Sequence, residues 1–436
     1  RGYCSKRMSE VSPPNDAASR ELRAESAPRP AGLMALRVGR TLAFAGVVVH
    51  AGFCPISIAA TQIGLAIAAA GIATAIAAGF RPSRTPLDAP LAALVIVCIA
   101  SDLLSPYGPP SLAFATLWRS ALGFWVVLQS LSLVAERRLR NAALAFAAAG
   151  LCVSAIVGLV QFRTGIDLVH LLGLRQHARA VEAPGLPGRF GAMGFFISRL
   201  TFGHNATLLV ALLGGSLAAG ALRGRTAALA GCAVVLGIAG IAATFDRAAW
   251  LGIGAAALVV ALFSGRGRRV ALACALLLVP VVLFPGVRSR VSTTFDWRAN
   301  ADRLFLWARA REIVRDHPWH GIGFGNYPRV CGIYYDRVDP TVYMRTWAHN
   351  SELSLLAETG PLGLLALLWA GFRAVRALVL SLRAGEPIAL GALAAVTALA
   401  VIGQAHDVFY DTKVMYALWL GIALGLPSGG RFRPAV

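Results

Sequence analysis

Long apolar segments recur along this chain of 436 residues, and they constrain its fold more than any other feature. A helix needs about 20 mostly apolar residues to cross the hydrocarbon core of a bilayer. The chain is 57% hydrophobic and only 14% charged, whereas soluble domains carry about 25% charged residues. We therefore predict an all-α polytopic membrane protein with about 12 transmembrane helices, at residues 40–54, 57–79, 88–104, 112–134, 141–161, 204–222, 227–244, 248–264, 270–285, 360–380, 387–405 and 413–427.

Arginines in the connections between these spans predict which side of the membrane each connection faces. Three short connections, at residues 105–111, at 285–286 and around Pro55, carry no arginine and are assigned to the outside. The alternation predicts that both chain termini are cytoplasmic. The inner connections, with two or three arginines each, are residues 81–87, 135–140, 223–226, 265–269, 373–386 and the C-terminal tail.

This topology divides the chain into five parts. The N-terminal tail is polar and contains several prolines, which is typical of disorder. The parts are a disordered cytoplasmic tail at residues 1–39, nine spans at 40–286 with an outer loop at 162–203, a large outer loop with short helices at 287–359, three spans at 360–427, and a cytoplasmic tail at 428–436.

The two long outer loops break the charge pattern, because both are rich in arginine. Long loops can cross a membrane regardless of charge, so one interpretation is a solvated basic surface. Lysine is absent from both loops, however, and only arginine offers a planar group that binds phosphate through two parallel hydrogen bonds. The loops therefore also predict recognition of phosphate or pyrophosphate. Their fifteen arginines are Arg163, Arg175, Arg179, Arg189, Arg199, Arg288, Arg290, Arg298, Arg303, Arg309, Arg311, Arg315, Arg329, Arg337 and Arg345.

Arg303 begins a predicted helix at residues 302–316. At about 100° per residue, Arg303 lies on the apolar face of this helix, whereas Arg309 projects from the opposite face. Arg303 is therefore expected to point toward the protein or lipid and to need an anionic partner, and Arg309 is expected to be solvated. The apolar face consists of Leu306, Trp307, Ala310, Ile313 and Val314.

Three further arginines lie at or inside the predicted spans. Arg247 occupies a tight outer turn, Phe245-Asp-Arg-Ala-Ala-Trp250, where an ion pair with Asp246 is the alternative to a functional role. Arg163 leaves the fifth span at the outer boundary, so it either binds substrate or extends to the lipid headgroups. Arg119 lies within the fourth span, where a charged side chain is costly and is usually paired.

His349 lies near the end of the second long loop, directly before Asn350-Ser-Glu352. Asn350 or Ser351 can cap a short helix there, which Gly360-Pro361 would end. The positive end of a helix disfavours a charged imidazole ring, so His349 is expected to stay neutral and able to accept a proton. The alternative is a histidine that braces the loop. Glu352 could orient the ring or the acceptor, or could simply favour the start of its helix.

The sequence predicts no metal or cofactor. The seven cysteines form no Cys-x-x-Cys pair, and their spacing to histidines does not resemble a zinc site. The outer loops show no Asp-x-Asp or other carboxylate cluster that would suit Mg²⁺. The glycines in Gly321-Ile-Gly-Phe-Gly325 lack a βαβ context, so they predict tight turns rather than a nucleotide site.

Several of these motifs, taken in order, resemble the O-antigen ligase and polymerase superfamily. The resemblance covers about residues 190–380 by motif and the whole chain by topology. One departure is Asp246, where the family often has a small residue. The motifs are Asp246-Arg-Ala-Ala-Trp250, Arg303, Asp316-His-Pro-Trp-His-Gly-Ile-Gly-Phe-Gly-Asn326, His349-Asn350 and Glu358-Thr-Gly-Pro-Leu-Gly363.

The resemblance implies an inner-membrane glycosyltransferase that moves a glycan from undecaprenyl pyrophosphate to an acceptor on the periplasmic face. In ligases the acceptor is a sugar hydroxyl of the lipid A–core. The family's functional residues would correspond to Arg247, Arg303 and His349, with arginines binding pyrophosphate and the histidine acting as base in an inverting, metal-independent transfer. We expect further substrate contacts from Arg163, Arg189, Arg309, Asn350 and Glu352.

Other functions remain open at this point. An O-antigen polymerase and a protein O-oligosaccharyltransferase use the same donor; the single dominant outer loop favours the ligase. A transporter or flippase of lipid-linked glycan is the alternative of another class, although no repeated halves are evident. Nucleic-acid binding is excluded because the basic clusters lie outside. A transport path could be lined by Gln62, Arg119, Gln129, Gln161, Gln404 and His406.

Overall fold

The computed structural model describes residues 30–108, 115–174, 176–183, 186–265, 296, 298–335 and 347–428. Within these ranges the chain is helical, and its only extended pairing is one isolated bridge between Glu182 and Phe190. Three predicted segments lie outside these described ranges: the span at 270–285 and the tail residues 1–29 and 429–436. The count of twelve spans therefore stays a prediction.

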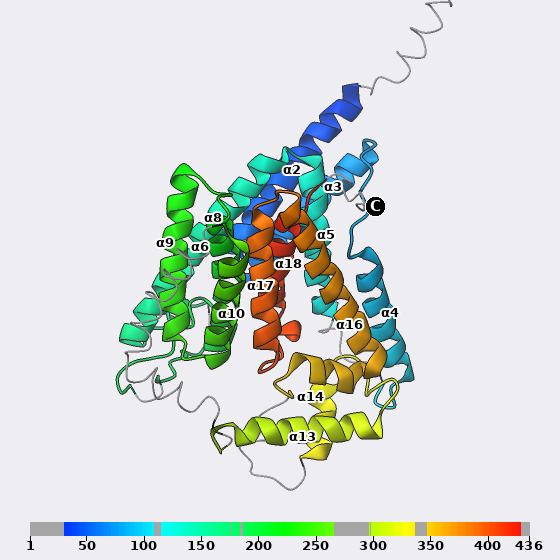
Figure 1. Ribbon diagram of the computed structural model, residues 1–436, viewed down its shortest axis with the longest axis vertical. Helices are drawn as coiled ribbons and strands as arrows, with labels where there is room; N and C mark the ends of the chain where they lie inside the picture. The colour runs from blue at the N-terminus through cyan, green and yellow to red at the C-terminus, as the bar shows by residue number, and fades with distance from the viewer. Residues whose placement is uncertain are drawn as a thin grey trace, which may run out of the picture.

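The long helices pack side by side as one bundle (Figure 1). Each of the eleven predicted spans that fall in the described ranges coincides with one helix. The helices are α2 (Pro30–Phe53), α3 (Ile58–Ala77), α4 (Asp88–Leu104), α5 (Ala115–Leu133), α6 (Glu136–Thr164), α8 (Arg199–Ala218), α9 (Gly224–Ala243), α10 (Arg247–Phe263), α16 (Ser351–Arg383), α17 (Ile388–Gly403) and α18 (Thr412–Gly425).

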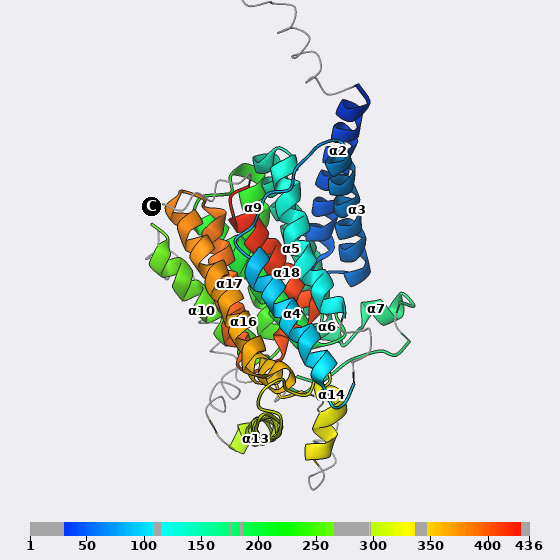
Figure 2. The same cartoon turned by 90° about the vertical axis from the view of Figure 1, so that its right-hand side faces the viewer.

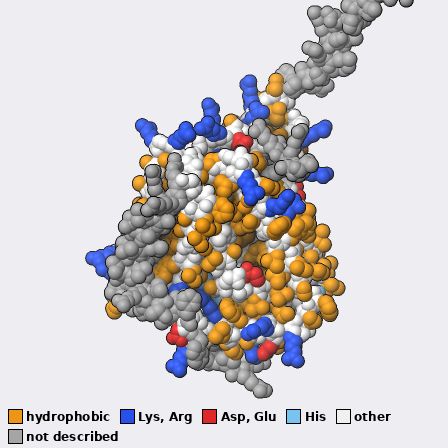
Figure 3. Space-filling model, in the orientation of Figure 1, with side chains coloured by type: hydrophobic (Ala, Val, Ile, Leu, Met, Phe, Trp, Pro, Cys, Tyr) orange, Lys and Arg blue, Asp and Glu red, His pale blue; other side chains and the backbone are white. Residues whose placement is uncertain are grey.

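Six of these helices are long and apolar enough to cross a membrane, namely α2, α3, α6, α8, α9 and α16, and four others are shorter apolar helices. On the face drawn in Figure 3, hydrophobic side chains occupy the middle of the bundle, and Lys and Arg side chains gather toward its two ends. Such a distribution is expected of helices that span a bilayer. The fold class predicted from the sequence is thus supported as a polytopic, all-helical membrane protein.

Helix α2 begins earlier than predicted. It starts at Pro30, so residues 30–39, which were expected to belong to the disordered tail, are helical. This segment is mostly apolar, with Arg37 as its one charged residue, and an apolar span that begins at Gly32 includes most of it. Arg40 fixes this end, because its Nε donates to the carbonyl of Leu133 at 3.1 Å.

Small residues hold α2 against α3. A Cβ atom on Gly46 would lie 2.3 Å from the backbone nitrogen of Ala68, and one on Gly64 would lie 2.5 Å from that of His50. Only glycine allows two backbones to approach so closely, which is a common way of joining helices in membranes. The first two spans are therefore a tightly packed antiparallel pair.

A layer of short elements covers one end of the bundle, as Figures 1 and 2 show. Helix α13 runs across this end and contacts α16. The predicted apolar face of α13 is confirmed, since Leu306, Ala310 and Ile313 are fully buried. The layer comprises η2 (Arg298–Asn300), α13 (Ala301–Asp316), α14 (Tyr327–Val330) and η3 (Cys331–Tyr334), and two further short elements in other loops are α7 (Leu168–Leu171) and η4 (Val408–Tyr410).

The predicted cap at the start of α16 is confirmed, and the predicted end of a short helix at Gly360-Pro361 is a kink within α16 (Ser351–Arg383). Asn350 caps it by accepting a hydrogen bond from the backbone N–H of Leu353 at 2.8 Å. The helix breaks at Gly360, whose φ of 67° lies in the left-handed region. A Cβ there would lie 2.1 Å from the carbonyl oxygen of Trp319, so the covering layer and the kink require glycine at this position.

Candidate functional site

Two cavities of about 450 and 470 Å³ lie next to each other beside the covering layer. They share three lining residues, Leu200, His349 and His406. One is rich in arginine and is called the arginine cavity; it is also lined by Arg199, Phe245, Asp246, Arg247, Asn300, Asp302 and Arg303. The other is called the aromatic cavity; it is also lined by Ile58, Ser198, Thr201, His204, Trp347, Asp407, Val408, Tyr410, Asp411, Thr412 and Lys413.

Two arginines predicted from the sequence, Arg247 and Arg303, meet in the arginine cavity. Nη2 of Arg247 donates to Oδ1 of Asn300 at 3.1 Å. Nη2 of Arg303 lies 3.4 Å from Nε2 of His406, so Arg303 does point into the protein, as its place on the apolar face of α13 predicts. The alternative of an ion pair between Arg247 and Asp246 is not what these contacts show. The side chains of these adjacent residues point in different directions, so Arg247 contacts Asn300 and Asp246 contacts His204 and His406.

Arg199 is the third arginine of this cavity, and the sequence analysis named it only as one of fifteen loop arginines. Its Nη1 donates to the carbonyl of Thr244 at 2.6 Å, which ties the start of α8 to the turn before α10. Arg199 and Arg247 are the first residues of α8 and α10. The positive ends of two helix dipoles therefore add to the three guanidinium groups, and such an arrangement suits an anion such as phosphate.

His349 lies at the boundary of the two cavities, directly before the cap of α16. Its φ is 53°, a conformation that residues other than glycine rarely adopt. Its backbone N–H donates to Oδ2 of Asp407 at 2.7 Å, and its Nδ1 lies 4.0 Å from the same oxygen. The side chain of His349 is 29% exposed, so the ring remains accessible to a ligand.

Asp407 supports this loop from the connection between α17 and α18. Its side chain is only 8% exposed, and burial raises its pKa to about 6, although hydrogen bonds from Ser354 and from the backbone N–H groups of His349 and Asn350 act in the opposite direction. Oδ1 of Asp407 accepts a short hydrogen bond from Ser354. The carboxylate is therefore held in one orientation, beneath the loop that carries His349.

Aromatic and polar groups line the other cavity. The rings of Trp347 and Tyr410 are 4.6 Å apart between centroids. Asp411 accepts a hydrogen bond from Thr201 at 2.7 Å, and Lys413 stands nearby on the same wall. An aromatic surface flanked by carboxylates and hydroxyls can bind a polyhydroxylated ligand, since it offers both an apolar face and hydrogen-bond partners.

The other predicted substrate-binding residues line neither cavity. Arg309 pairs with Glu312 at 2.7 Å on the far side of α13. Arg189 lies over the ring of Phe162, and Arg163 is exposed at the end of α6. The remaining two brace the start of α16: Asn350 caps the helix, and Glu352 accepts a hydrogen bond from Gln404 at 3.0 Å.

Two polar residues considered for a transport path have structural partners instead. Gln129 bonds to the backbone N–H and carbonyl of Ser83, and Gln161 bonds to the backbone of Met193 and Gly194. These amides fix loops to the bundle. Arg119 lies outside the residues whose side chains are described.

The sequence named Asp246 and His406 only for other roles, and it did not predict that they meet His204 at the span ends. His204 on α8 lies 2.8 Å from Asp246, and His406 lies 3.4 Å from the same carboxylate. Within the described ranges these three form the one group of histidine, cysteine and acidic side chains close enough to hold a metal ion. A usable signal was the density of ionisable residues at 406–413, in a short connection between two apolar spans.

Comparison with known families agrees with the motif order. Residues 232–368 match a family described as O-antigen ligase, and this segment contains Arg247, Arg303 and His349. No curated protein matches the chain. The match supports a function of the O-antigen ligase or polymerase type. Residues 232–368 are thus similar to the O-antigen ligase family, and this similarity supports the resemblance to the O-antigen ligase superfamily.

Proposed function

We propose that this protein is an O-antigen ligase of the bacterial inner membrane, which transfers a glycan from undecaprenyl pyrophosphate to a sugar hydroxyl of the lipid A–core on the periplasmic face. One observation carries the proposal: His349 stands where an arginine-lined cavity meets an aromatic, carboxylate-lined cavity. A transfer between a pyrophosphate-linked donor and a sugar acceptor needs two adjoining sites of these two kinds.

The arginine cavity would hold the pyrophosphate of the donor. Arg199, Arg247 and Arg303 line it, and guanidinium groups bind phosphate oxygens in pairs. As the bond between the anomeric carbon and the pyrophosphate breaks, negative charge grows on the leaving group. Positive groups already placed around that charge stabilise it without reorganisation.

His349 would act as the general base. Its ring takes the proton of the acceptor hydroxyl while that oxygen forms a bond to the anomeric carbon. The bond to pyrophosphate breaks on the opposite side, and undecaprenyl pyrophosphate leaves with the electron pair. A single displacement of this kind inverts the anomeric configuration.

The aromatic cavity would hold the acceptor sugar. Trp347 and Tyr410 offer ring faces, and Asp411 and Lys413 offer polar contacts on the same wall. Because the arginines supply the positive charge that a metal would otherwise provide, we propose that transfer needs no divalent metal ion.

The opposite side of the bundle supports the proposed orientation. Connections that the sequence assigns to the cytoplasm meet there. Arg140 pairs with Glu136 and with Glu386, each at 2.7 Å. Arg137 and Arg223 line a third cavity together with these three residues. Arginines gathered at this end agree with a cytoplasmic face, which would leave His349 in the periplasm.

The proposal is tested by reconstituting the purified protein with an undecaprenyl-pyrophosphate glycan and rough lipopolysaccharide. A shift of the lipopolysaccharide to lower mobility on a gel is expected. A ladder of longer lipid-linked glycans would instead identify a polymerase. If folded protein gives neither product, the proposal is contradicted and transport of the lipid-linked glycan is favoured.

A further inference from the structure

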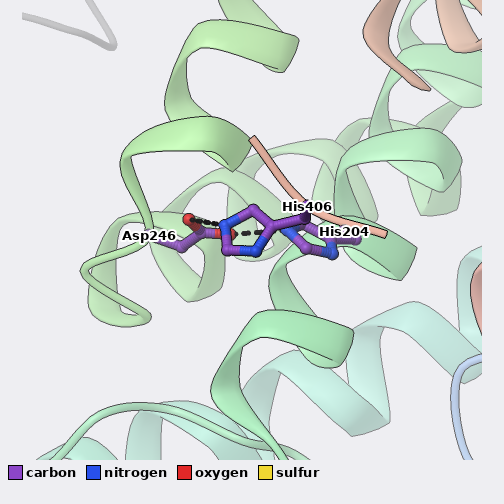
Figure 4. A group of neighbouring side chains, drawn as sticks. All are labelled: His204, Asp246 and His406. Atoms are coloured by element: carbon purple, nitrogen blue, oxygen red, sulfur yellow. Dashed lines mark ion pairs between the residues drawn. The ribbon is translucent and has the colours of Figure 1, made fainter. Parts of the chain in front are cut away.

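Three buried side chains from separate parts of the chain converge at the wall between the two cavities (Figure 4). His204 comes from α8, Asp246 from the start of α10, and His406 from the connection between α17 and α18. One nitrogen of each histidine and a carboxylate oxygen all lie within 4.8 Å of one another. We propose that this cluster is a binding site for a divalent transition-metal ion of the Zn²⁺ class.

Unmet hydrogen-bonding capacity is the first argument for a metal ion. Nε2 of His204 and Oδ2 of Asp246 form a buried ion pair at 2.8 Å, and neither atom has a further hydrogen-bond partner among the described residues. Burying polar atoms without a full set of hydrogen bonds destabilises the folded state. An ion that accepts both lone pairs would remove this cost.

Distances between the three ligand atoms suit one shared ion. Zinc binds imidazole nitrogen and carboxylate oxygen at about 2.0–2.2 Å, so two ligands of a tetrahedral site lie roughly 3.3 Å apart. Here Nε2 of His204 is 2.8 Å from Oδ2 of Asp246, and Nε2 of His406 is 3.4 Å from Oδ1. All three ligand atoms lie within 4.8 Å of one another, so side-chain shifts on the order of 1 Å would bring them to one shared ion.

The carboxylate is held in position before any ion arrives. Oδ1 of Asp246 accepts a hydrogen bond from the backbone N–H of Ala248 at 3.1 Å, which caps α10. Helices α8, α10 and α17 pack against one another, so the elements that carry or adjoin the three ligands form a rigid frame. Partners of this kind orient metal ligands and raise affinity.

Ligand chemistry selects the class of metal. Two imidazoles and one carboxylate favour Zn²⁺, Co²⁺ or Ni²⁺, whereas Mg²⁺ and Ca²⁺ prefer oxygen ligands alone. Three protein ligands leave one position open, and His406 lines both cavities, so an ion has a path from solvent.

Metal binding and the arginine cavity compete for one nitrogen. Nε2 of His406 also faces Nη2 of Arg303 at 3.4 Å, and that nitrogen has a single lone pair. The contact with Arg303 and a bond to metal are therefore alternatives. We propose that transfer occurs in the metal-free form. Whether the cluster binds a metal ion is tested independently of that proposal.

The test is a titration of tag-free protein in detergent with Co²⁺ after removal of metals by chelation. Visible d–d absorption that saturates at one Co²⁺ per chain and disappears on adding Zn²⁺ is expected. Asp246→Asn and His204→Gln should weaken binding about tenfold or more. His349→Gln, which changes a histidine of the same cavities outside the cluster, should bind as wild type does.

Asparagine caps helices as well as aspartate, so Asp246→Asn is expected to remain folded, and thermal unfolding checks this. X-ray absorption of the Zn²⁺-loaded wild type gives a second readout that needs no variant: two imidazole ligands are expected. Absence of the d–d bands, equal Co²⁺ affinity in Asp246→Asn, or a Zn²⁺ spectrum without imidazole would overturn the proposal.

Discussion

The backbone N–H of His349 donates to a carboxylate oxygen of Asp407 at 2.7 Å, while His349 itself holds a φ of 53°. A residue other than glycine in this region carries about 1–3 kcal/mol of strain and persists only where its surroundings hold it. Asp407 supplies that support across 58 positions of sequence. The proposed base is thus placed by a carboxylate in a different connection.

Replacing Asp407 should therefore slow transfer without weakening donor binding. In Asp407→Ala we expect kcat to fall about 100-fold, because a small misplacement of a catalytic group has an effect of this size. Asp407→Asn keeps an oxygen that can accept the His349 N–H and should retain much more activity. Transfer kinetics at varied donor concentration give the result, and wild-type kcat in Asp407→Ala would show that the support is unnecessary.

Arg303 and Arg309 lie on one helix but are expected to differ sharply. Arg303→Lys keeps the charge yet loses the planar, two-pronged group, and we expect a loss of about 100-fold or more in kcat/KM. Arg309→Lys changes a residue paired with Glu312 outside both cavities, so its kcat/KM should stay within about twofold of wild type. Equal effects in the two variants would remove the reason for assigning the pyrophosphate to the arginine cavity.

Chelation should not slow transfer. The proposed transfer relies on Arg199, Arg247 and Arg303 for positive charge and on no metal ion. We expect that adding Mg²⁺ to the EDTA-treated protein leaves the initial rate unchanged. Activity that disappears with EDTA and returns with Mg²⁺ would rule out this part of the mechanism.

Gly360 should be essential for stability, whereas Gly371 on the same helix should not. A Cβ on Gly360 would lie 2.1 Å from the Trp319 carbonyl oxygen, and the φ of 67° adds strain. Gly360→Ala is expected to destabilise the protein by about 2 kcal/mol or more. Gly371 has open space around its Cβ direction, so Gly371→Ala serves as the control. Thermal unfolding in detergent compares them, and equal midpoints would contradict the role of the kink.

Much of the fold could be predicted because a membrane helix is encoded by consecutive residues. Apolar segments located eleven helices of the bundle, and periodicity identified the buried face of α13 through Leu306, Ala310 and Ile313. The start of α2 at Pro30 was missed, because Arg37 and Arg40 interrupt the apolar residues at the beginning of this helix. Backbone positions such as Gly360 were found because glycine followed by proline is a local break signal.

The site was only partly predictable for a physical reason. Arg247, Arg303 and His349 stand in local motifs, and the structure brings them to one cavity. The other site residues are single polar residues at span ends, and they come together only in the folded structure. They are Arg199, Asp407 and the histidines beside Asp246. Arg309 was included among the substrate contacts, although its pairing with Glu312 one turn away satisfies its charge.

The most direct measurement is the rate of glycan transfer to rough lipopolysaccharide by reconstituted His349→Ala beside wild type. Both proteins should bind the donor with similar affinity and unfold at similar temperatures. We expect the variant to lose transfer by about 100-fold or more, the contribution of a general base. Transfer at the wild-type rate by folded His349→Ala would show that His349 does not remove the proton from the acceptor hydroxyl.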